Sequence, residues 1–305
     1  MRANALLLPF LIIPAWFVQR AASVEYENLP GVARYSSDYL LSWDSHYTQF
    51  TVYRRDGKAV FSAPERKDDS SAVTLAVDSD GTVAEAYHVP QVAKGRIDLL
   101  DLSGRVTGSI DTGSYVAQQI AFAPDHSVWT AGYMANSDGT RDFKVLRHYA
   151  RTGEELGEAL RWSEIGFDLK HPVVESIRGG QLLYVSKDRV GWNTACRPGP
   201  RLWVEVSFAG VVLGKYDLKT GDGLSLFTEA MTANGNVYAK IFKPRSARFA
   251  ILDRSKGIWE EVSGDPGGVL IGSDGDDLVF ATRESDRTLL TFTPSRLLHA
   301  QGTQQ

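Results

Sequence analysis

The chain has 305 residues, of which 23% are charged, and its formal net charge is −4. This length can bury a substantial core, and the charge gives no general basic surface for nucleic acid. Cys196 is the only cysteine in the sequence, which excludes an intrachain disulfide. We therefore expect an ordinary globular protein that does not bind nucleic acid.

Residues 1–23 have the pattern of a secretory signal peptide. Arg2 supplies a positive start, residues 5–18 form an apolar run with two prolines, and small residues close the segment. The run is short for a membrane-spanning helix. We expect a mature domain over residues 24–305 in a secreted or periplasmic location, and an uncleaved membrane anchor is the alternative. Cleavage would also remove Arg20 and would change the net charge from −4 to −6.

Residues 73–110 show the internal pattern of the folded part most clearly. Short apolar strands flank turn residues 78–81, two more strands flank residues 101–104, and a longer loop at 87–95 separates the two pairs. Asp and Gly favour tight turns, because Asp bonds nearby backbone and Gly tolerates positive φ. The segment is therefore predicted to be a four-stranded antiparallel unit with two hairpins. We interpret residues 78–81 as a hairpin turn and not as the start of a calcium loop.

The same two turns recur along the chain. The second turn repeats at intervals of 47, 49, 57 and 47 residues, at Gly57, Gly104, Gly153, Gly210 and Gly257. The first turn recurs six times, and in the fourth unit we place it at residues 178–180. This pattern predicts six units, of which the last lacks its fourth strand. Residues 24–29 precede the first inner strand, 32–35, at the distance expected for that missing strand.

Four-stranded units at this spacing favour an all-β fold, a six-bladed β-propeller whose ring is closed by the N-terminal strand. A β-sandwich is the alternative, but it does not explain the repeated pair of turns. Residues 75–104 resemble the NHL-repeat unit of six-bladed propellers, in which an apolar-Asp-x-x-Gly turn precedes an Arg-Ile strand that ends in Gly. The resemblance implies the architecture and assigns no functional residue. Where the second strand of an NHL unit ends in Asp, this chain has Tyr87, Gly132 and Lys187.

The loop at residues 188–201 is the strongest candidate for ligand binding. It carries Arg189, Trp192, Arg197 and Arg201, and Arg and Trp are frequent anchors of binding surfaces. We expect Trp192 to be exposed on this loop, with the alternative that it packs against its own loop. With a mature charge near −6, such a local basic patch would select an acidic partner.

Four residues are candidates for the channel at the ring axis. The repeat alignment places Glu175 and Glu229 on innermost strands, and His46 and His88 in equivalent loops of the first two units. Paired carboxylates with histidines could hold a divalent cation or exchange protons. A solvated channel wall is the alternative interpretation.

No catalytic sequence motif appears in the chain, so whether the protein is an enzyme stays open. The pattern favours an exported, non-catalytic binding module for a protein, peptide or glycan, without a cofactor. The alternative is a propeller hydrolase or lyase with a divalent cation at the central channel. We expect membrane association only through an uncleaved N-terminal segment.

Overall fold

The computed structural model describes most of the chain between residues 22 and 300. The described residues are 22–27, 33–43, 49–64, 71–135, 142–165, 183–194, 202–218, 228–243, 246–285 and 287–300. Within these ranges the protein is all-β, with short 3₁₀ helices at η1 (Pro90–Val92), η2 (Trp162–Ile165) and η3 (Ser295–Leu297). None of the helices in these ranges is long and apolar enough to cross a membrane.

Most strands belong to four-stranded antiparallel units that follow one another along the chain. The first units contain β2 (Ala33–Ser36), β3 (Tyr39–Trp43), β4 (Gln49–Arg54) and β5 (Ala59–Pro64), then β6 (Ser71–Val77), β7 (Val83–Val89), β8 (Lys94–Leu100) and β9 (Val106–Asp111). The next unit contains β10 (Tyr115–Phe122), β11 (Val128–Met134), β12 (Lys144–Tyr149) and β13 (Glu155–Arg161). The unit after it contains β14 (Leu183–Val185), β15 (Arg189–Asn193), β16 (Leu202–Ser207) and β17 (Val212–Asp217). The last contain β18 (Thr228–Met231), β19 (Val237–Lys243), β20 (Ser246–Asp253) and β21 (Ile258–Ser263), then β22 (Val269–Asp274), β23 (Asp277–Glu284) and β24 (Arg287–Pro294).

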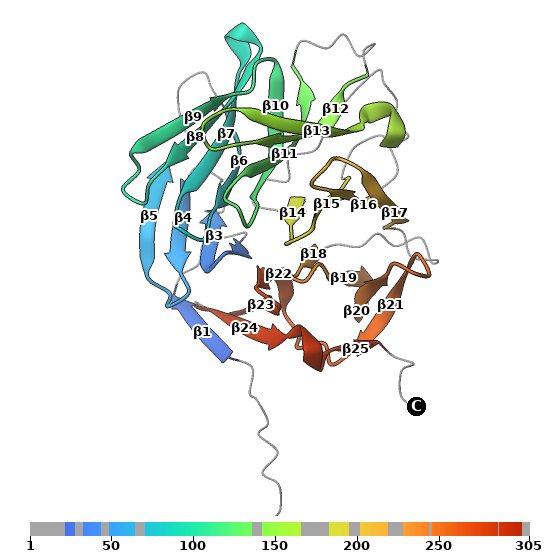
Figure 1. The fold of residues 1–305 in the computed structure, drawn as a ribbon. Coiled ribbons are helices and arrows are strands. Elements are labelled where there is room, and N and C mark those ends of the chain that lie inside the picture. Colours follow the sequence, from blue (N-terminus) through green and yellow to red (C-terminus); the bar gives the residue numbers. More distant parts are fainter. Residues whose placement is uncertain are drawn as a thin grey trace, which may run out of the picture.

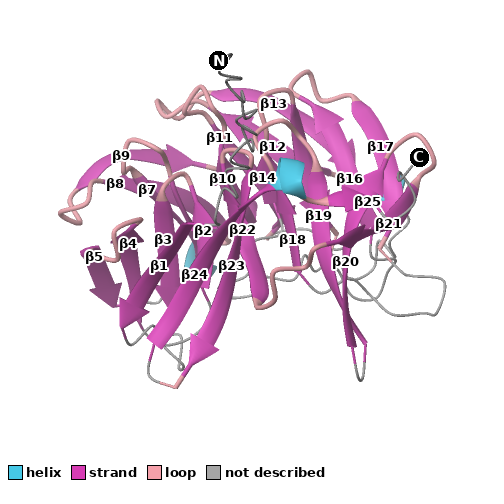
Figure 2. Cartoon of the chain, turned by 90° about the horizontal axis from the view of Figure 1, so that it is seen from below, coloured by secondary structure: helices cyan, strands magenta, loops and turns pink. Residues whose placement is uncertain are grey.

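The units are arranged around a common axis as in a β-propeller. The first strand of each unit contacts the first strand of the next, from β6 through β10, β14, β18 and β22 to β2. Strands β14, β18 and β22 accordingly lie toward the centre, and β5, β17 and β21 lie toward the rim (Figure 1). Seen at 90° to this view, the strands run between two faces of the ring (Figure 2). The expected all-β propeller is therefore confirmed.

The N-terminal strand closes the ring, as the sequence predicted. Strand β1 (Ala22–Glu27) pairs antiparallel with β24, with Val24 opposite Leu290, and takes the position of a fourth strand beside β22–β24. Tyr26 is 1% exposed, and its hydroxyl donates to the backbone carbonyl of Arg54 at 3.1 Å. The strand begins at Ala22, two residues inside the segment expected to be the leader.

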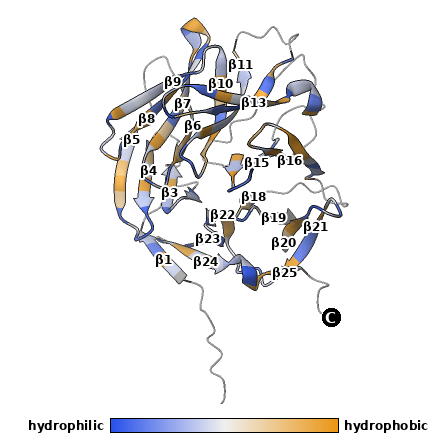
Figure 3. Cartoon of the chain, in the orientation of Figure 1, coloured by the Kyte–Doolittle hydropathy of each residue, from blue (hydrophilic) through white to orange (hydrophobic). Residues whose placement is uncertain are grey.

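Apolar side chains fill the spaces between neighbouring units. One cluster, for example, joins Trp129 and Leu146 of unit β10–β13 to Val190 and Val204 of unit β14–β17. Hydrophobic stretches accordingly lie along the strands (Figure 3). Each sheet has two apolar faces, and stacking around the axis removes both faces from water.

The strand assignment in unit β14–β17 differs from the sequence prediction. Its first turn was expected at residues 178–180, which lie outside the described residues, but the turn of the structure is at residues 186–188, between β14 and β15. This turn has no glycine. Its backbone is held by the Ser186 hydroxyl, which accepts from the backbone N–H of Arg189 at 3.3 Å. Because the sequence prediction relied on glycine in the turn, it placed the first turn of this unit too early along the chain.

One side chain in each second turn reaches the preceding unit, and we call it the latch residue. The latch residues are Arg55, Leu102, Arg151, Phe208 and Arg254. Arg55 donates to Asp274 at 2.5 Å, Arg254 donates to Glu205 at 2.7 Å, and Phe208 stacks on Trp129 with ring centroids 6.3 Å apart. Leu102 packs against the cluster that contains Tyr39. At this one repeated position, ion pairs or apolar contacts thus hold neighbouring units together.

Candidate binding site at the axis

Arg34 is a buried charge at the centre of the ring. It lies on β2, the first strand of its unit, and only 3% of its surface is exposed. Its Nε has no hydrogen-bond partner, and no carboxylate in the described part of the chain forms an ion pair with it. The guanidinium lies 5.9 Å from the ring centroid of Trp43. Burial of a charge without a carboxylate partner, as the described residues show it for Arg34, is costly, so Arg34 requires an explanation other than stability.

Tyr184 interacts electrostatically with Arg34 from another part of the ring. Burial lowers the pKa of Arg34 to about 10, and Tyr184 opposes this shift. The strands β2 and β14 that carry the two residues are not neighbours in the ring, so their interaction crosses the region of the axis. Burial raises the pKa of Tyr184 far above its usual value, and the charge of Glu229 adds to that effect. At neutral pH Tyr184 is therefore a neutral phenol and does not compensate the charge of Arg34.

Glu229 and Asn193 complete this axial cluster. Glu229 lies on β18 and is 3% exposed; its backbone carbonyl accepts from the Tyr184 hydroxyl at 2.6 Å. The side-chain amide of Asn193, at the end of β15, donates to the Glu229 carboxylate. The Oδ1 atom of Asn193 and the Oγ1 atom of Thr228 are buried without hydrogen-bond partners among the described residues.

This arrangement suits recognition of an anionic group. A guanidinium can donate two parallel hydrogen bonds to a carboxylate or phosphate, and the low dielectric of a buried site strengthens them. The Glu229 carboxylate and the Asn193 amide provide hydrogen-bonding groups for the rest of such a ligand. The contacts place one carboxylate, Glu229, in the cluster.

Of the four channel residues predicted from the sequence, the structure describes two. Glu229 lies on an innermost strand, as expected. His88 lies near the end of β7, where its ring meets Tyr133 edge-on at 6.5 Å, its Nε2 has no partner among the described residues, and burial lowers its pKa. The described contacts of Glu229 and His88 are to different residues, so they do not bring the two together. Glu175 and His46 lie outside the described residues.

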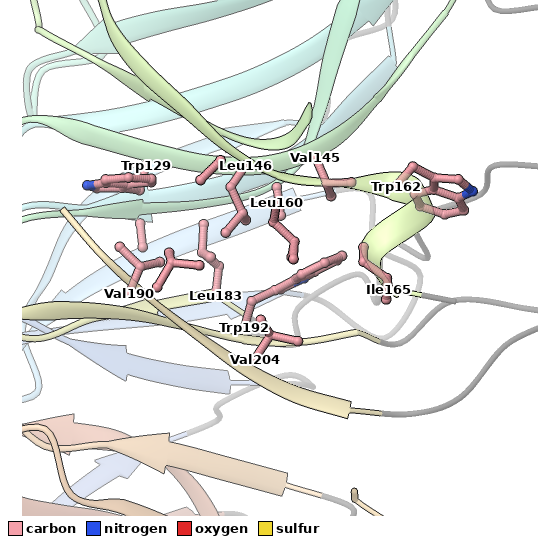
Figure 4. Packing of buried hydrophobic residues seen from close by; sticks show 14 of the residues in the cluster. Trp129, Val145, Leu146, Leu160, Trp162, Ile165, Leu183, Val190, Trp192 and Val204 are labelled. Atoms are coloured by element: carbon pink, nitrogen blue, oxygen red, sulfur yellow. The ribbon is translucent and has the colours of Figure 1, made fainter. Parts of the chain in front are cut away.

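The predicted exposure of Trp192 is wrong. Trp192 is in strand β15 with no exposed surface, and it packs among Leu160, Leu183 and Val204 (Figure 4). The error follows from the misplaced turn, because residues 189–193 form a strand and not a loop. A binding role for this residue stays an untested hypothesis.

Arg189 also lies on β15, and its guanidinium is used within the protein. It donates to Asp188 at 2.8 Å and to the buried Glu205 at 3.2 Å. The hydrogen bond to Asp188 raises the pKa of Arg189 above its usual value. Arg197 and Arg201, the other members of the expected basic patch, lie outside the described residues.

One cluster in the described ranges has three potential metal ligands, and it lies at a turn and not at the axis. Asp78, Asp80 and His126 approach one another there. The guanidinium of Arg151 donates to both carboxylates, and His126 Nδ1 lies 2.9 Å from the Asp78 carboxylate. The latch arginine thus supplies the positive charge that a cation would provide. Residues 78–81 form the expected hairpin turn, with Gly81 at φ 87°.

The sequence pattern did not identify Arg34, Tyr184 or Asn193. Arg34 was within the expected inner strand at residues 32–35. A charged residue in a strand that must be buried is unusual, and it could have indicated a functional site. Tyr184 and Asn193 were hidden by the misplaced turn. Their proximity depends on the ring, which no local pattern reveals.

The fold and the axial cluster define this protein as a β-propeller with a polar, buried centre. No family model matches the sequence, and no curated protein matches it. Solved structures are similar in fold. A candidate exported protein from Bacteroides fragilis has a TM-score of 0.55 at 11% identity and covers 92% of this chain and 95% of that chain.

Two other solved structures are also similar. A gluconolactonase from Xanthomonas campestris has a TM-score of 0.53 at 12% identity, covering 89% of this chain and 90% of that chain. TolB from Acinetobacter baumannii has a TM-score of 0.47 at 15% identity, covering 87% of this chain and 64% of that chain. At these identities the likeness of the first two structures concerns the fold alone.

Proposed function

We propose that this protein is an exported, non-catalytic propeller of six NHL-like blades that binds a protein, peptide or glycan. The ligand presents a carboxylate or phosphate group to Arg34 at the axis. The observation that carries this proposal is the burial of Arg34 without a carboxylate partner in the described residues. Binding sites commonly retain a charge that costs stability in the free protein.

Export is supported by the leader pattern of residues 1–23 and by the similarity in fold to a candidate exported protein. Because β1 begins at Ala22, cleavage just before Ala22 would leave the closing strand intact. Mass spectrometry of the native protein should find an N-terminus between residues 22 and 24. An intact Met1 on a cytosolic protein would contradict export.

A binding module has more support than a hydrolase or lyase with a divalent cation. A site for a hard cation needs several oxygen ligands, usually with more than one carboxylate. The axial contacts of the described residues supply Glu229 alone, and Arg34 adds a positive charge to the same cluster.

The test measures thermal stability with small anionic probes at constant ionic strength. Galacturonate and inorganic phosphate are compared with galactose, a neutral sugar of similar shape. A ligand that binds only the folded state raises the melting temperature with its concentration. At least one anionic probe should raise it and galactose should not.

Two variants test whether the rise in melting temperature depends on the site at the axis. Arg34→Met should abolish the shift, because it keeps the length of the side chain and removes the charge. Arg248→Met is the matched control, since Arg248 is half-exposed on β20 and should leave the shift unchanged. A shift that persists in Arg34→Met would overturn the proposal. So would stabilisation by Ca²⁺ or Mg²⁺ that Glu229→Gln removes, because that result favours the cation-dependent alternative.

A further inference from the structure

Two buried residues of opposite charge lie at the centre of the ring, and they belong to different units. Arg34 is on β2 and Glu229 is on β18, and each has only 3% of its surface exposed. The strand β22 contacts both β2 and β18, so the two strands that carry the charges are not neighbours around the axis. A ligand that contacts both residues therefore has to span part of the centre.

The side chain of Asn193 adds an unsatisfied acceptor on the Glu229 side. Its amide donates to the Glu229 carboxylate. Because a carboxylate only accepts hydrogen bonds, the amide nitrogen must face Glu229, and the Oδ1 atom is directed elsewhere. Asn193 is 3% exposed, and its Oδ1 has no hydrogen-bond partner among the described residues. An unpaired buried acceptor is costly, so we expect this atom to receive a donor from a ligand.

Arg34 presents the opposite hydrogen-bonding character. A guanidinium only donates, and the Nε atom of Arg34 has no partner within the described ranges. The axial cluster thus leaves a donor unpaired on one unit and an acceptor unpaired on another. A ligand that satisfies both must accept hydrogen bonds at one end and donate them at the other.

Tyr184 lies within electrostatic range of both charges. The charge of Glu229 raises the pKa of Tyr184, and Tyr184 opposes the lowering of the Arg34 pKa. The Tyr184 hydroxyl donates to the backbone carbonyl of Glu229 at 2.6 Å, so its proton is used within the protein. Its ring packs against Trp203, with the ring centroids 5.6 Å apart. This arrangement favours a ligand whose two polar ends are separated by a spacer.

We propose that the axial site binds an extended zwitterion, in which a carboxylate pairs with Arg34 and an ammonium group pairs with Asn193 Oδ1 and Glu229. This inference rests on the proposed function and adds the second group that the ligand carries. An ammonium group has three donors and no acceptor, which matches an amide oxygen beside a carboxylate. The negative charge of Glu229 favours a cationic donor over a hydroxyl, because charge-assisted hydrogen bonds are the stronger ones. Long-chain amino acids and short peptides with free termini have this chemistry.

The test compares zwitterions with matched carboxylates that lack the ammonium group. The first probes are 4-aminobutyrate, 6-aminohexanoate and 8-aminooctanoate, which differ in spacing, and their controls are butyrate, hexanoate and octanoate. Triglycine has a peptide spacer of the same number of bonds as 8-aminooctanoate, and its control is N-acetyl-triglycine. The comparison of triglycine with 8-aminooctanoate distinguishes a peptide from an amino acid with an aliphatic chain.

Two-dimensional NMR of the ¹⁵N-labelled protein follows the side-chain amide of Asn193, whose oxygen is the expected contact of the ammonium group. At least one zwitterion should shift this signal in a saturable way. It should bind about tenfold more tightly than its matched carboxylate, as expected for a hydrogen bond between charged groups.

Two variants assign the two ends of the ligand. Glu229→Gln keeps an oxygen that can accept from Asn193, and it should reduce the preference for the zwitterion to about twofold or less while the affinity for the carboxylate stays the same. Arg34→Met should abolish binding of both kinds of probe. Glu154→Gln, at an exposed position, is the matched control and should leave both affinities unchanged.

The outcomes separate this inference from the proposed function. Equal affinity of zwitterions and matched carboxylates would overturn the inference and leave an anion site at Arg34. A preference that persists in Glu229→Gln would also overturn it, because the ammonium group would then bind elsewhere. No saturable shift with any probe, phosphate and galacturonate included, would overturn both.

Discussion

The guanidinium of Arg151 pairs with the carboxylate of Asp78 across the joint between two units that are adjacent in the ring. Asp78 is 3% exposed, and it also lies within hydrogen-bond distance of His126. A buried carboxylate needs such partners because its desolvation is costly. The contact therefore connects two sheets that are not joined by strand pairing.

Removing this latch should destabilise the protein. Arg151→Met removes the one guanidinium that pairs with the buried Asp78 carboxylate among the described residues and leaves it with Ser79 and His126 as partners. We expect a loss of about 2–4 kcal/mol in the free energy of unfolding. Arg105→Met is the matched control, because Arg105 lies in the corresponding turn of the preceding unit and its side chain is 77% exposed. Urea unfolding measures both effects, and equal losses in the two variants would contradict the role of the latch.

A double-mutant cycle separates the pair from other effects of the substitution. If Arg151 acts mainly through Asp78, the variant with both Arg151→Met and Asp78→Asn should be more stable than the sum of the single losses predicts. The coupling should be at least about 1 kcal/mol. Additive losses would show that Arg151 stabilises the joint by some other contact.

Closure of the ring predicts a strong effect of one N-terminal residue. Tyr26 is buried against the last unit and the first, so Tyr26→Ala should cost about 3–5 kcal/mol. Its neighbour Glu25 is half-exposed, and within the described ranges it forms an ion pair with the exposed Arg287 at 3.0 Å. Glu25→Ala should therefore cost less than about 1 kcal/mol. Thermal unfolding of both variants would show no difference if β1 were unimportant for stability.

The lowered pKa values of two aspartates predict how the stability of the protein changes at acidic pH. A hydrogen bond from Arg189 lowers the pKa of Asp188 to about 2, and a hydrogen bond from Arg151 holds the pKa of Asp80 well below its usual value. Because the folded-state pKa lies below the unfolded one, the stabilisation is present above pH 4 or so and is lost as pH falls toward 2. Both side chains are nearly half exposed, so each contributes less than about 1 kcal/mol.

The double variant Asp80→Asn, Asp188→Asn should be less stable at pH 6 and should lose less stability between pH 4.5 and 2.5. Urea unfolding across this pH range measures the slope. Glu154→Gln, at an exposed position, is the control and should keep the slope of the parent protein. Parallel curves for parent and double variant would refute this origin of the acid sensitivity.

The architecture was predictable because it depends on local signals that repeat. Turns that begin with Asp and end with Gly, as at residues 78–81 and 101–104, mark hairpins, and the spare strand at the N-terminus follows from counting strands. The residues 183–194 show where this approach fails. Their turn is held by the Ser186 hydroxyl and contains no glycine, so it lacks the pattern on which the prediction relied. The axial cluster was hidden for another reason, since Arg34 and Tyr184 come within electrostatic range only through the closed ring.

The corrected position of Trp192 leads to a prediction opposite to the one for a surface residue. Trp192→Ala should cost about 3–5 kcal/mol, because the side chain has no exposed surface and fills the space between two sheets. Trp192→Phe should retain most of that stability. Denaturant unfolding distinguishes the cases, and a loss below 1 kcal/mol for the alanine variant would place the side chain outside the core.

Arg34 should behave in the opposite way from these core residues. Its charge is buried at 3% exposure with no ion pair among the described residues, so the neutral Arg34→Met should make the free protein more stable by about 1–3 kcal/mol. Arg254→Met is the contrasting variant. Arg254 donates to the fully buried Glu205 at 2.6 Å, and its loss leaves one fewer partner for that carboxylate. Arg254→Met should therefore destabilise the protein in the same urea titration. If Arg34→Met were as destabilising as Arg254→Met, Arg34 would be a structural residue and its burial would need no ligand to explain it.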